Sequence, residues 1–270
     1  MLDYLAVGHI AQDLTPDGIR LGGTVSYSAL TAHALGLRVG IVTAATEDAV
    51  MDGLESVAVH RLPSSRNTTF ENRYGPEGRT QILHARAEPL KPADVPIEWR
   101  TAPIIHLAPI AREIDSDFSR HFPNAFIGLT PQGFLRQWDG PGRVSHAEWR
   151  EAAATLAMVS ATVISIEDVA GDWALIECWA AAAKILVVTQ GEQGATVFDK
   201  SGRHHLPAPA VNVVDPTGAG DIFAASFFIR LWQTRDPIES TRFAVALASD
   251  SVTRVGLDGI PKQYSIPNTQ

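Results

Sequence analysis

The sequence predicts an α/β fold with a mostly parallel central sheet flanked by helices, together with a small β-hairpin that projects as a lid. Two observations lead to this class. Short apolar runs of strand length alternate with segments of helical periodicity through most of the chain, as they do where helices connect parallel strands. Residues 64–90 instead alternate polar and apolar side chains around a Gly-Pro-Glu-Gly turn, which is typical of a hairpin with one wet face.

The first part of the chain supplies two strands, one helix and the hairpin. YLAVGHI, near the N-terminus, is an apolar run that ends in a turn and predicts a buried strand. After a glycine-rich turn, VSYSALTAHALGL has helical spacing and stops at Gly36. VGIVTAA predicts the second strand, and TTFENRY with RTQILHARA predicts the two arms of the lid.

The second part returns to alternating strands and helices. PIIHLAPI and AFIGLT predict strands, and SHAEWREAAATLAMV predicts a helix that begins at Ser145, with Glu148 completing a capping box. TVISI, GDWALIECWAAAA and KILVVTQ continue the alternation, followed by a hairpin in ATVFDKSGRHHLPA and two final helices. We find no internal repeat or linker, so residues 1–270 are predicted to form a single domain that carries the lid.

Composition narrows the class of protein. A net charge of −8 argues against nucleic acid and anionic membranes as partners, because both require basic patches. The one cysteine, Cys178, excludes an internal disulfide and is predicted to be buried in a helix. The N-terminus lacks a basic region, and no apolar run reaches membrane-spanning length. We therefore expect a cytoplasmic protein.

The segment VVDPTGAGDIFAASF (213–227) carries the strongest chemical signal. Asp215 ends the apolar stretch AVNVV, which predicts a strand, and ligands of open α/β sheets bind at the carboxyl ends of strands. Gly218, Ala219 and Gly220 leave backbone N–H groups unobstructed at a helix start, which attracts anions. Asp221 lies in the same turn, where it could accept a proton from an attacking hydroxyl. The alternative, a simple helix cap, does not explain three successive small residues.

Two further features lie near the N-terminus. The pair Gly22-Gly23 opens a helix, which lets backbone N–H groups approach a polar ligand, although many ordinary turns also contain two glycines. Asp13 follows the first strand and is either a ligand-binding acid or a solvated turn residue.

Two loops that follow later strands offer nucleotide and metal groups. Thr189 ends a strand and is followed by Gly191 and Gly194. A glycine-rich loop of this kind can bind nucleotide phosphates, but it also occurs in hairpins. Glu167 and Asp168 follow another strand, where carboxylates could hold Mg²⁺ or merely start a solvated helix. A Walker-type G-x-x-x-x-G-K-[ST] loop is absent from the sequence.

Taken together, these pieces resemble the ribokinase-like, or PfkB-type, carbohydrate kinase family. DPTGAGD (215–221) matches the C-terminal signature of that family, and LGGTVSYSALTAHALG matches its di-glycine region more loosely. The order also agrees, with VGHIAQD first, TTFENRYGPEGR as lid, VTQGEQG before the signature and VTRVG after it. The resemblance spans nearly the whole chain.

The resemblance implies an enzyme, a phosphotransferase that uses Mg²⁺ and ATP to phosphorylate a hydroxyl of a small polyol, sugar or nucleoside. Asp221 would be the general base, and the amides of residues 218–221 would be the anion hole. The acceptor would be held by Asp13, Gly22, Gly23 and Tyr27. The ATP site would be lined by Thr189, Gly191 and Gly194. A monovalent cation, K⁺, would be surrounded by oxygens of Asp215, Thr217, Ser251, Arg254 and Gly256.

The sequence also departs from the family pattern. Tyr27 lies where sugar-specific members carry Asn, which weakens a ribose assignment. The N-x-x-E metal motif appears as Ser165-x-x-Asp168 with Glu167 adjacent, so the Mg²⁺ residue stays open between the two acids. In the di-glycine region and the lid, the residues resemble those of the inositol- and nucleoside-kinase-like branches more than those of the other branches. In many relatives the lid pairs two subunits, so a homodimer through the lid is a further expectation.

Two other functions are compatible with the same features. One is a kinase of the hydroxymethylpyrimidine or pyridoxal type, against which the polar hairpin counts because such kinases usually lack that lid. The other is a catalytically silent protein that binds a sugar or nucleotide as a sensor. Asp221 with both glycines counts against it, since a sensor needs no base.

Overall fold

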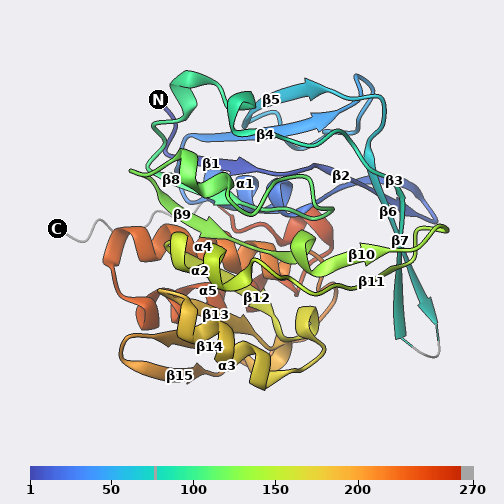
Figure 1. Ribbon diagram of the computed structural model, residues 1–270. Coiled ribbons are helices and arrows are strands. Elements are labelled where there is room, and N and C mark those ends of the chain that lie inside the picture. The colour runs from blue at the N-terminus through green and yellow to red at the C-terminus, as the bar shows by residue number, and fades with distance from the viewer. Residues whose placement is uncertain (76–77, 263–270) are drawn as a thin grey trace.

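A central, mostly parallel sheet organises the molecule, and the computed structural model describes residues 1–75 and 78–262. Its strands are β1 (Tyr4–Val7), β4 (Val39–Ala45), β5 (Ala58–Pro63), β8 (Ile104–Leu107), β9 (Phe126–Leu129), β12 (Ala161–Ser165), β13 (Leu186–Thr189), β14 (Ala195–Asp199) and β15 (Gly202–Leu206). They lie in the order β15-β14-β13-β12-β9-β8-β1-β4-β5 (Figure 1). Neighbours from β13 to β5 are parallel, while β14 pairs antiparallel with β13 and β15. The predicted fold class is confirmed.

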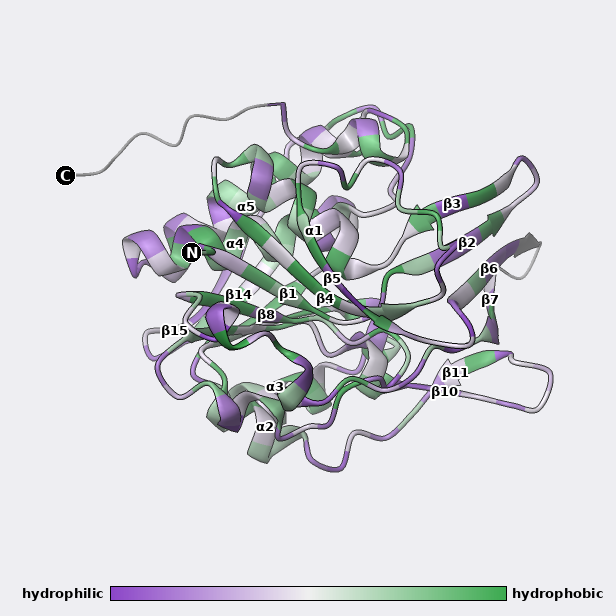
Figure 2. Ribbon diagram, turned by 90° about the horizontal axis from the view of Figure 1, so that it is seen from above, coloured by the Kyte–Doolittle hydropathy of each residue, from purple (hydrophilic) through white to green (hydrophobic). Residues whose placement is uncertain are grey.

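Helices cover both faces of this sheet (Figure 2). One face carries α1 (Thr24–Ala34), α4 (Ala219–Thr234) and α5 (Pro237–Ser251), and the other carries α2 (Ala152–Met158) and α3 (Trp173–Ala182). Short 3₁₀ turns are η1 (Pro92–Asp94), η2 (Ile97–Trp99), η3 (Phe118–His121), η4 (Gln132–Leu135), η5 (Ile166–Val169), η6 (Gly191–Gln193) and η7 (Gly256–Gly259). Cys178 is exposed and not buried as predicted, because α3 turns Ile176 and Trp179 to the core instead. In the described part of the chain, no helix is long and apolar enough to cross a membrane.

A second sheet stands beside the carboxyl edge of the first. It consists of β2 (Ala11–Thr15), β3 (Gly18–Gly22), β6 (Thr68–Gly75) and β7 (Gly78–Ala85), in the order β3-β2-β6-β7 (Figure 1). The hairpin predicted at 64–90 is confirmed as β6 and β7. Sequence analysis missed its partner hairpin, β2–β3, because AQDLT lacks the apolar run that marks a buried strand. We call these four strands the lid sheet.

A small third hairpin joins the lid sheet to the central sheet. It is formed by β10 (Arg136–Trp138) and β11 (Val144–His146), which pair antiparallel. The Leu83 N–H on β7 donates to the Gly142 carbonyl at 2.8 Å. The helix predicted from Ser145 is wrong at its start, because Ser145 pairs with Gln137 in this hairpin and α2 begins only at Ala152.

The position of α4 depends on a close approach to β9. A Cβ atom on Gly128 would lie 2.5 Å from Cδ2 of Phe228, so α4 packs directly on the backbone of that strand. Phe227, Phe228 and Ile229 are all fully buried. This packing places the first turn of α4 at the carboxyl edge of the sheet, next to the lid sheet.

Candidate active site

The first turn of α4 contains the residues predicted to form an anion site. Gly218 caps the helix with φ 78°, and a Cβ atom there would collide with the ring of Tyr27. A Cβ atom on Gly220, in contrast, would meet no heavy atom within 4 Å. The Ala219 N–H donates to the Pro216 carbonyl at 3.2 Å. Gly220 and Asp221 follow in the first turn, where the N–H groups of a helix lack acceptors within the helix.

Asp221 follows directly and has the electrostatics of a base. The pKa of its carboxyl group is raised to about 6, chiefly by burial and to a smaller extent by the charges of Asp13 and Asp168. A hydrogen bond from Thr24 and the positive charge of Arg136 act in the opposite direction. A carboxylate with this pKa can accept a proton near neutral pH. The residue is only partly buried by surface area, so a ligand can reach it.

The predicted acceptor residues lie together beside this turn. Asp13, on β2, rests its carboxylate against Gly22, where any Cβ atom would collide with it. Gly23 starts α1 with φ 90°, and a Cβ atom there would lie 2.8 Å from the His9 carbonyl oxygen.

Tyr27 is more deeply placed than the sequence suggested. It is 4% exposed, with its ring packed on Gly218. Burial raises its pKa well above the ordinary value, and the charges of Asp221, Asp13 and Asp215 act in the same direction, so the hydroxyl stays protonated. Tyr27 therefore supports the anion site, and its contact with an acceptor stays a prediction.

The predicted donor residues line a separate part of the same edge. Thr189 ends β13, and its hydroxyl donates to the Ile164 carbonyl at 3.3 Å. Gly191 and Gly194 flank η6 with φ 57° and 96°, and a Cβ atom on Gly194 would collide with the Leu206 carbonyl oxygen. Glycine at 194 thus lets the chain after β15 pass close to the loop.

The stretch before Asp215 is not the strand predicted from AVNVV. Residues 207–214 form no regular element, and the N–H groups of Val214 and Asp215 donate to the Val252 carbonyl at 2.7 and 3.1 Å. They bind the end of α5 and not a neighbouring strand. Val211, Val213 and Val214 are consequently 40–55% exposed. The strand prediction from AVNVV was wrong because these apolar side chains lie on the surface and not in the core.

The residues predicted to bind a monovalent cation lie around a turn that is held by hydrogen bonds to Asp215. Its carboxylate accepts from the N–H of Thr217 at 2.9 Å and of Gly256 at 2.8 Å. Burial acts to raise the pKa of Asp215, but these hydrogen bonds and the charge of Arg20 outweigh it and lower the pKa. The Ser251 hydroxyl donates to Ala248, and the Arg254 guanidinium binds Asp250 and the Asp258 carbonyl. The structure thus brings Asp215, Thr217 and Gly256 together, while Ser251 and Arg254 hold the adjoining backbone.

The two candidate magnesium acids differ in position. Asp168 accepts from the Ser165 N–H at 2.9 Å and from the Gln132 amide at 3.5 Å, and its charge acts on Asp221. Glu167 is exposed. Across residues 1–75 and 78–262, no group of three or more His, Cys, Asp or Glu side chains is placed to hold a metal ion.

Two charged residues at this edge were missed by sequence reasoning. Glu113 is 1% exposed and accepts from three backbone N–H groups. Arg136, at the start of β10, donates to the Ile110 carbonyl at 3.1 Å and lies over the ring of Phe70. Glu113 also binds His9, and Arg136 lies over Phe70; these partners are distant in sequence, so no local motif marks either residue.

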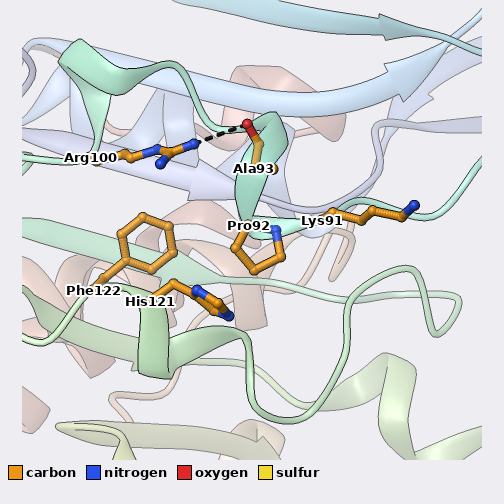
Figure 3. A pocket seen from close by; sticks show the side chains of 6 residues that line it. All are labelled: Lys91, Pro92, Ala93, Arg100, His121 and Phe122. Atoms are coloured by element: carbon orange, nitrogen blue, oxygen red, sulfur yellow. Dashed lines mark hydrogen bonds between the residues drawn. The ribbon is translucent and has the colours of Figure 1, made fainter.

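A small basic cavity lies apart from these residues. It has a volume of about 310 Å³ between η1 and η3 and is lined by Lys91, Pro92, Ala93, Arg100, His121 and Phe122 (Figure 3). Arg100 already donates to the Ala93 and Val95 carbonyls. None of the predicted site residues lines it, so it is separate from the candidate site.

Comparisons with known proteins agree with the sequence resemblance. A family model described as pfkB family carbohydrate kinase matches residues 163–263. A cytidine kinase of Thermococcus kodakarensis is 26% identical over 285 residues, covering 95% of this chain and 98% of that protein.

Solved structures match over nearly the whole chain. A pyrophosphate-dependent kinase in the ribokinase family, complexed with a pyrophosphate analog and myo-inositol, has a TM-score of 0.82 at 23% identity, covering 95% of this chain and 98% of that one. A fructokinase double mutant from Vibrio cholerae O395, with fructose, ADP and potassium bound, has a TM-score of 0.74 at 20% identity, covering 97% and 96%. At these identities the structures establish the fold. With the sequence relatives, they confirm the inferred resemblance and the kinase class.

Replacing Asp221 by Asn should stabilise the protein above neutral pH. The folded-state pKa of about 6 lies above the ordinary value of 3.8, so ionisation of Asp221 costs more in the folded than in the unfolded chain. Asp221→Asn should therefore raise the melting temperature at pH 8, and the gain should vanish near pH 4. A melting temperature at pH 8 equal to or below that of wild type would contradict the raised pKa.

The two glycines of the anion site should respond differently to substitution. Gly220→Val adds a side chain in open space, so the melting temperature should change by no more than about 2 °C while anion binding or turnover is lost. Gly218→Ala forces a residue into φ 78° and into the Tyr27 ring, which should cost about 1–3 kcal/mol of stability. Thermal unfolding and turnover of both variants test this, and equal destabilisation would reject the assignment.

Proposed function

From this resemblance to pfkB-type, ribokinase-like kinases, we propose that the chain transfers a phosphoryl group from ATP to a hydroxyl of a small polyol, sugar or nucleoside. The observation that carries the proposal is the start of α4. There a partly buried aspartate with a carboxyl pKa of about 6 lies in the first turn of the helix and within electrostatic reach of Asp13 from the lid sheet. A base, an anion site and an acceptor-side acid thus meet at one edge of the sheet.

The chemistry follows from this arrangement. Asp221 takes the proton of the acceptor hydroxyl as that oxygen forms a bond to the terminal phosphorus of the donor. The bond between this phosphorus and its bridging oxygen breaks, and ADP leaves. The N–H groups of Gly220 and Asp221 stabilise the negative charge that develops on the transferred group.

The exposed valines favour a nucleotide over a bare pyrophosphate as donor. The segment from Val211 to Val214 runs from the neighbourhood of Gly194 to the anion site, and Val255, 52% exposed, precedes Gly256 on the same side. Exposed apolar surface of this kind provides a place for a nucleobase. The pyrophosphate-dependent neighbour makes the alternative donor worth testing directly.

The residues fit the two cations that such a reaction uses. When bound, Mg²⁺ would neutralise charge on the donor phosphates, and we assign Asp168 over Glu167 because its charge faces Asp221. Mg²⁺ commonly takes one or two carboxylates and completes its shell with phosphate oxygens and water, so a larger acidic cluster is not required. Oxygens in the turn fastened by Asp215, between Thr217 and Gly256, would hold K⁺.

Asp13, Gly22 and Gly23 form the acceptor side, and the lid sheet would cover it. A cytidine kinase and a myo-inositol complex among the similar proteins favour nucleosides and inositols over ribose. A silent sensor is less well supported, because the raised pKa of Asp221 costs stability that simple binding does not need. A single domain over 1–270 and a homodimer through the lid sheet stay predictions.

Turnover of at least one acceptor is the direct test. Purified protein with Mg²⁺ and ATP should release ADP when supplied with one of a panel of inositols, nucleosides and sugars. Asp221→Asn should lower the rate by roughly 10²–10⁴-fold, which is the usual contribution of a general base. Wild-type turnover should also rise with pH around an apparent pKa near 6. Full activity of Asp221→Asn would remove the base assignment.

The donor site can be tested with a charged residue in the valine segment. Val213→Asp should raise KM for ATP about tenfold or more with little change in kcat, since burying a carboxylate under a nucleobase is unfavourable. Ile97→Asp, at a still more exposed apolar residue outside the site, is the control and should behave as wild type. If pyrophosphate supports faster turnover than ATP, and Val213→Asp leaves it unchanged, the nucleotide assignment is wrong.

A further inference from the structure

Arg136 occupies the junction between the lid sheet and the central sheet. The turn that precedes it, η4, is fixed because the Gly133 N–H donates to the Pro109 carbonyl at 2.7 Å, and a Cβ atom on Gly133 would lie 2.7 Å from the Ile110 nitrogen. The Arg136 guanidinium then donates to the Ile110 carbonyl at 3.1 Å. One side of this side chain is therefore anchored to the loop that follows β8.

The other side of Arg136 rests on the lid sheet. Its guanidinium carbon lies 5.4 Å from the ring centroid of Phe70, which is 3% exposed on β6. A cation over an aromatic face at this distance is attracted to it. Phe70 is also the register partner of Asp13 on β2. The aromatic support of Arg136 and the acceptor-side acid thus belong to neighbouring positions of the same lid strands.

The hairpin that carries Arg136 is bonded to the lid as well. Leu83 on β7 donates to the Gly142 carbonyl, and Ile82 forms a bridge with Arg143 beside β11. Trp138 and Val144 pack on the cluster of Ala11, Phe70, Leu83, Ile110 and Ala111. A displacement of the lid strands would therefore alter the surroundings of Arg136.

Arg136 also acts on the base. Four groups surround Asp221 with defined effects on its charge. Asp13 from β2 and Asp168 from η5 are negative, Thr24 from α1 donates a hydrogen bond, and Arg136 from β10 is positive. The charge of Asp221 also acts on Tyr4 from β1 and Tyr27 from α1, where with burial it raises the pKa so that both hydroxyls stay protonated. Two acids disfavour the ionised form of Asp221, whereas the Thr24 hydrogen bond and the positive charge of Arg136 favour it.

We propose that Arg136 is a positioning residue that couples the lid to the base: with Phe70 seated beneath it, its charge faces Asp221 and holds the carboxylate ready to accept the acceptor's proton. This inference rests on the proposed function and adds a condition to it. With the lid sheet displaced, Arg136 loses its support and Asp221 is protonated more readily. Proton transfer then requires the lid sheet to be in the position seen in the structure. This requirement disfavours transfer of the donor's phosphoryl group to water.

Two substitutions of Arg136 with one matched control test this coupling. Arg136→Met keeps the aliphatic stem and removes the charge, and Arg136→Lys keeps the charge without the planar fork. Arg86→Met is the control, because Arg86 lies 5.7 Å from the Trp138 ring centroid and donates to the Ala111 carbonyl in the same junction but is not among the main charges acting on Asp221. We expect Arg136→Met to lower kcat on the order of 10²-fold at pH 6.5 and to move the acidic limb of the pH–rate profile to higher pH. In Arg136→Lys the acidic limb should lie at the same pH as in wild type, and Arg86→Met should not move it.

A titration that needs no substrate separates this inference from the proposed function. The carboxyl carbon of Asp221, followed by ¹³C NMR with Asp221→Asn for assignment, should titrate at higher pH in Arg136→Met than in wild type. Phe70→Leu, which fills the same core but removes the ring, should shift it in the same direction. An unchanged titration in Arg136→Met, or an equal shift in Arg86→Met, overturns the coupling. A shifted titration without turnover of any acceptor by wild type would instead reject the kinase function and retain the link between Arg136 and Asp221.

Discussion

The buried carboxylate of Glu113 holds together the edge on which the candidate site is built. It accepts from the N–H of His9 at 2.9 Å, of Ile110 at 2.9 Å and of Ala111 at 2.7 Å, and so ties the end of β1 to the loop after β8. A buried carboxyl group is tolerated when its oxygens are hydrogen-bonded in this way. The same loop then supplies the Ile110 and Ala111 carbonyls for Arg136 and Arg86. The lid junction therefore depends on one buried acid.

The sequence predicted the repeating parts of the fold, because their signals are local. Apolar strands such as β1, β8 and β12 and the helices α1, α4 and α5 follow directly from hydrophobic patterning. Three predictions failed where tertiary contacts decide. The valines before Asp215 bind the end of α5, Ser145 pairs in a hairpin, and the polar strand β2 forms only because β3 and β6 flank it. Patterning identifies burial, and it cannot identify which polar segment will find a partner strand.

The site was predictable to the extent that one short segment carries it. Residues 218–221 combine small size, a helix start and an acid, and their geometry follows from local backbone rules. The need for glycine at 218 has a further cause, the ring of Tyr27, which lies 191 positions earlier in the chain. Arg136 and Glu113 were missed for the same reason, because their partners Phe70 and His9 come from other elements.

The balance of charge around α4 explains why such distant residues are required. Asp13, Asp168, Asp215 and Asp221 gather at one edge of a chain whose net charge is −8, and an anionic donor would be repelled by them. The N–H groups at the start of α4 offset part of this charge, and Arg20 and Arg136 contribute positive charge from the lid sheet and its junction. Both arginines lie on or against the strands that would cover the acceptor. The position of the lid sheet therefore sets the local potential as well as access, so acceptor binding and affinity for the phosphate donor should be coupled through the same two side chains.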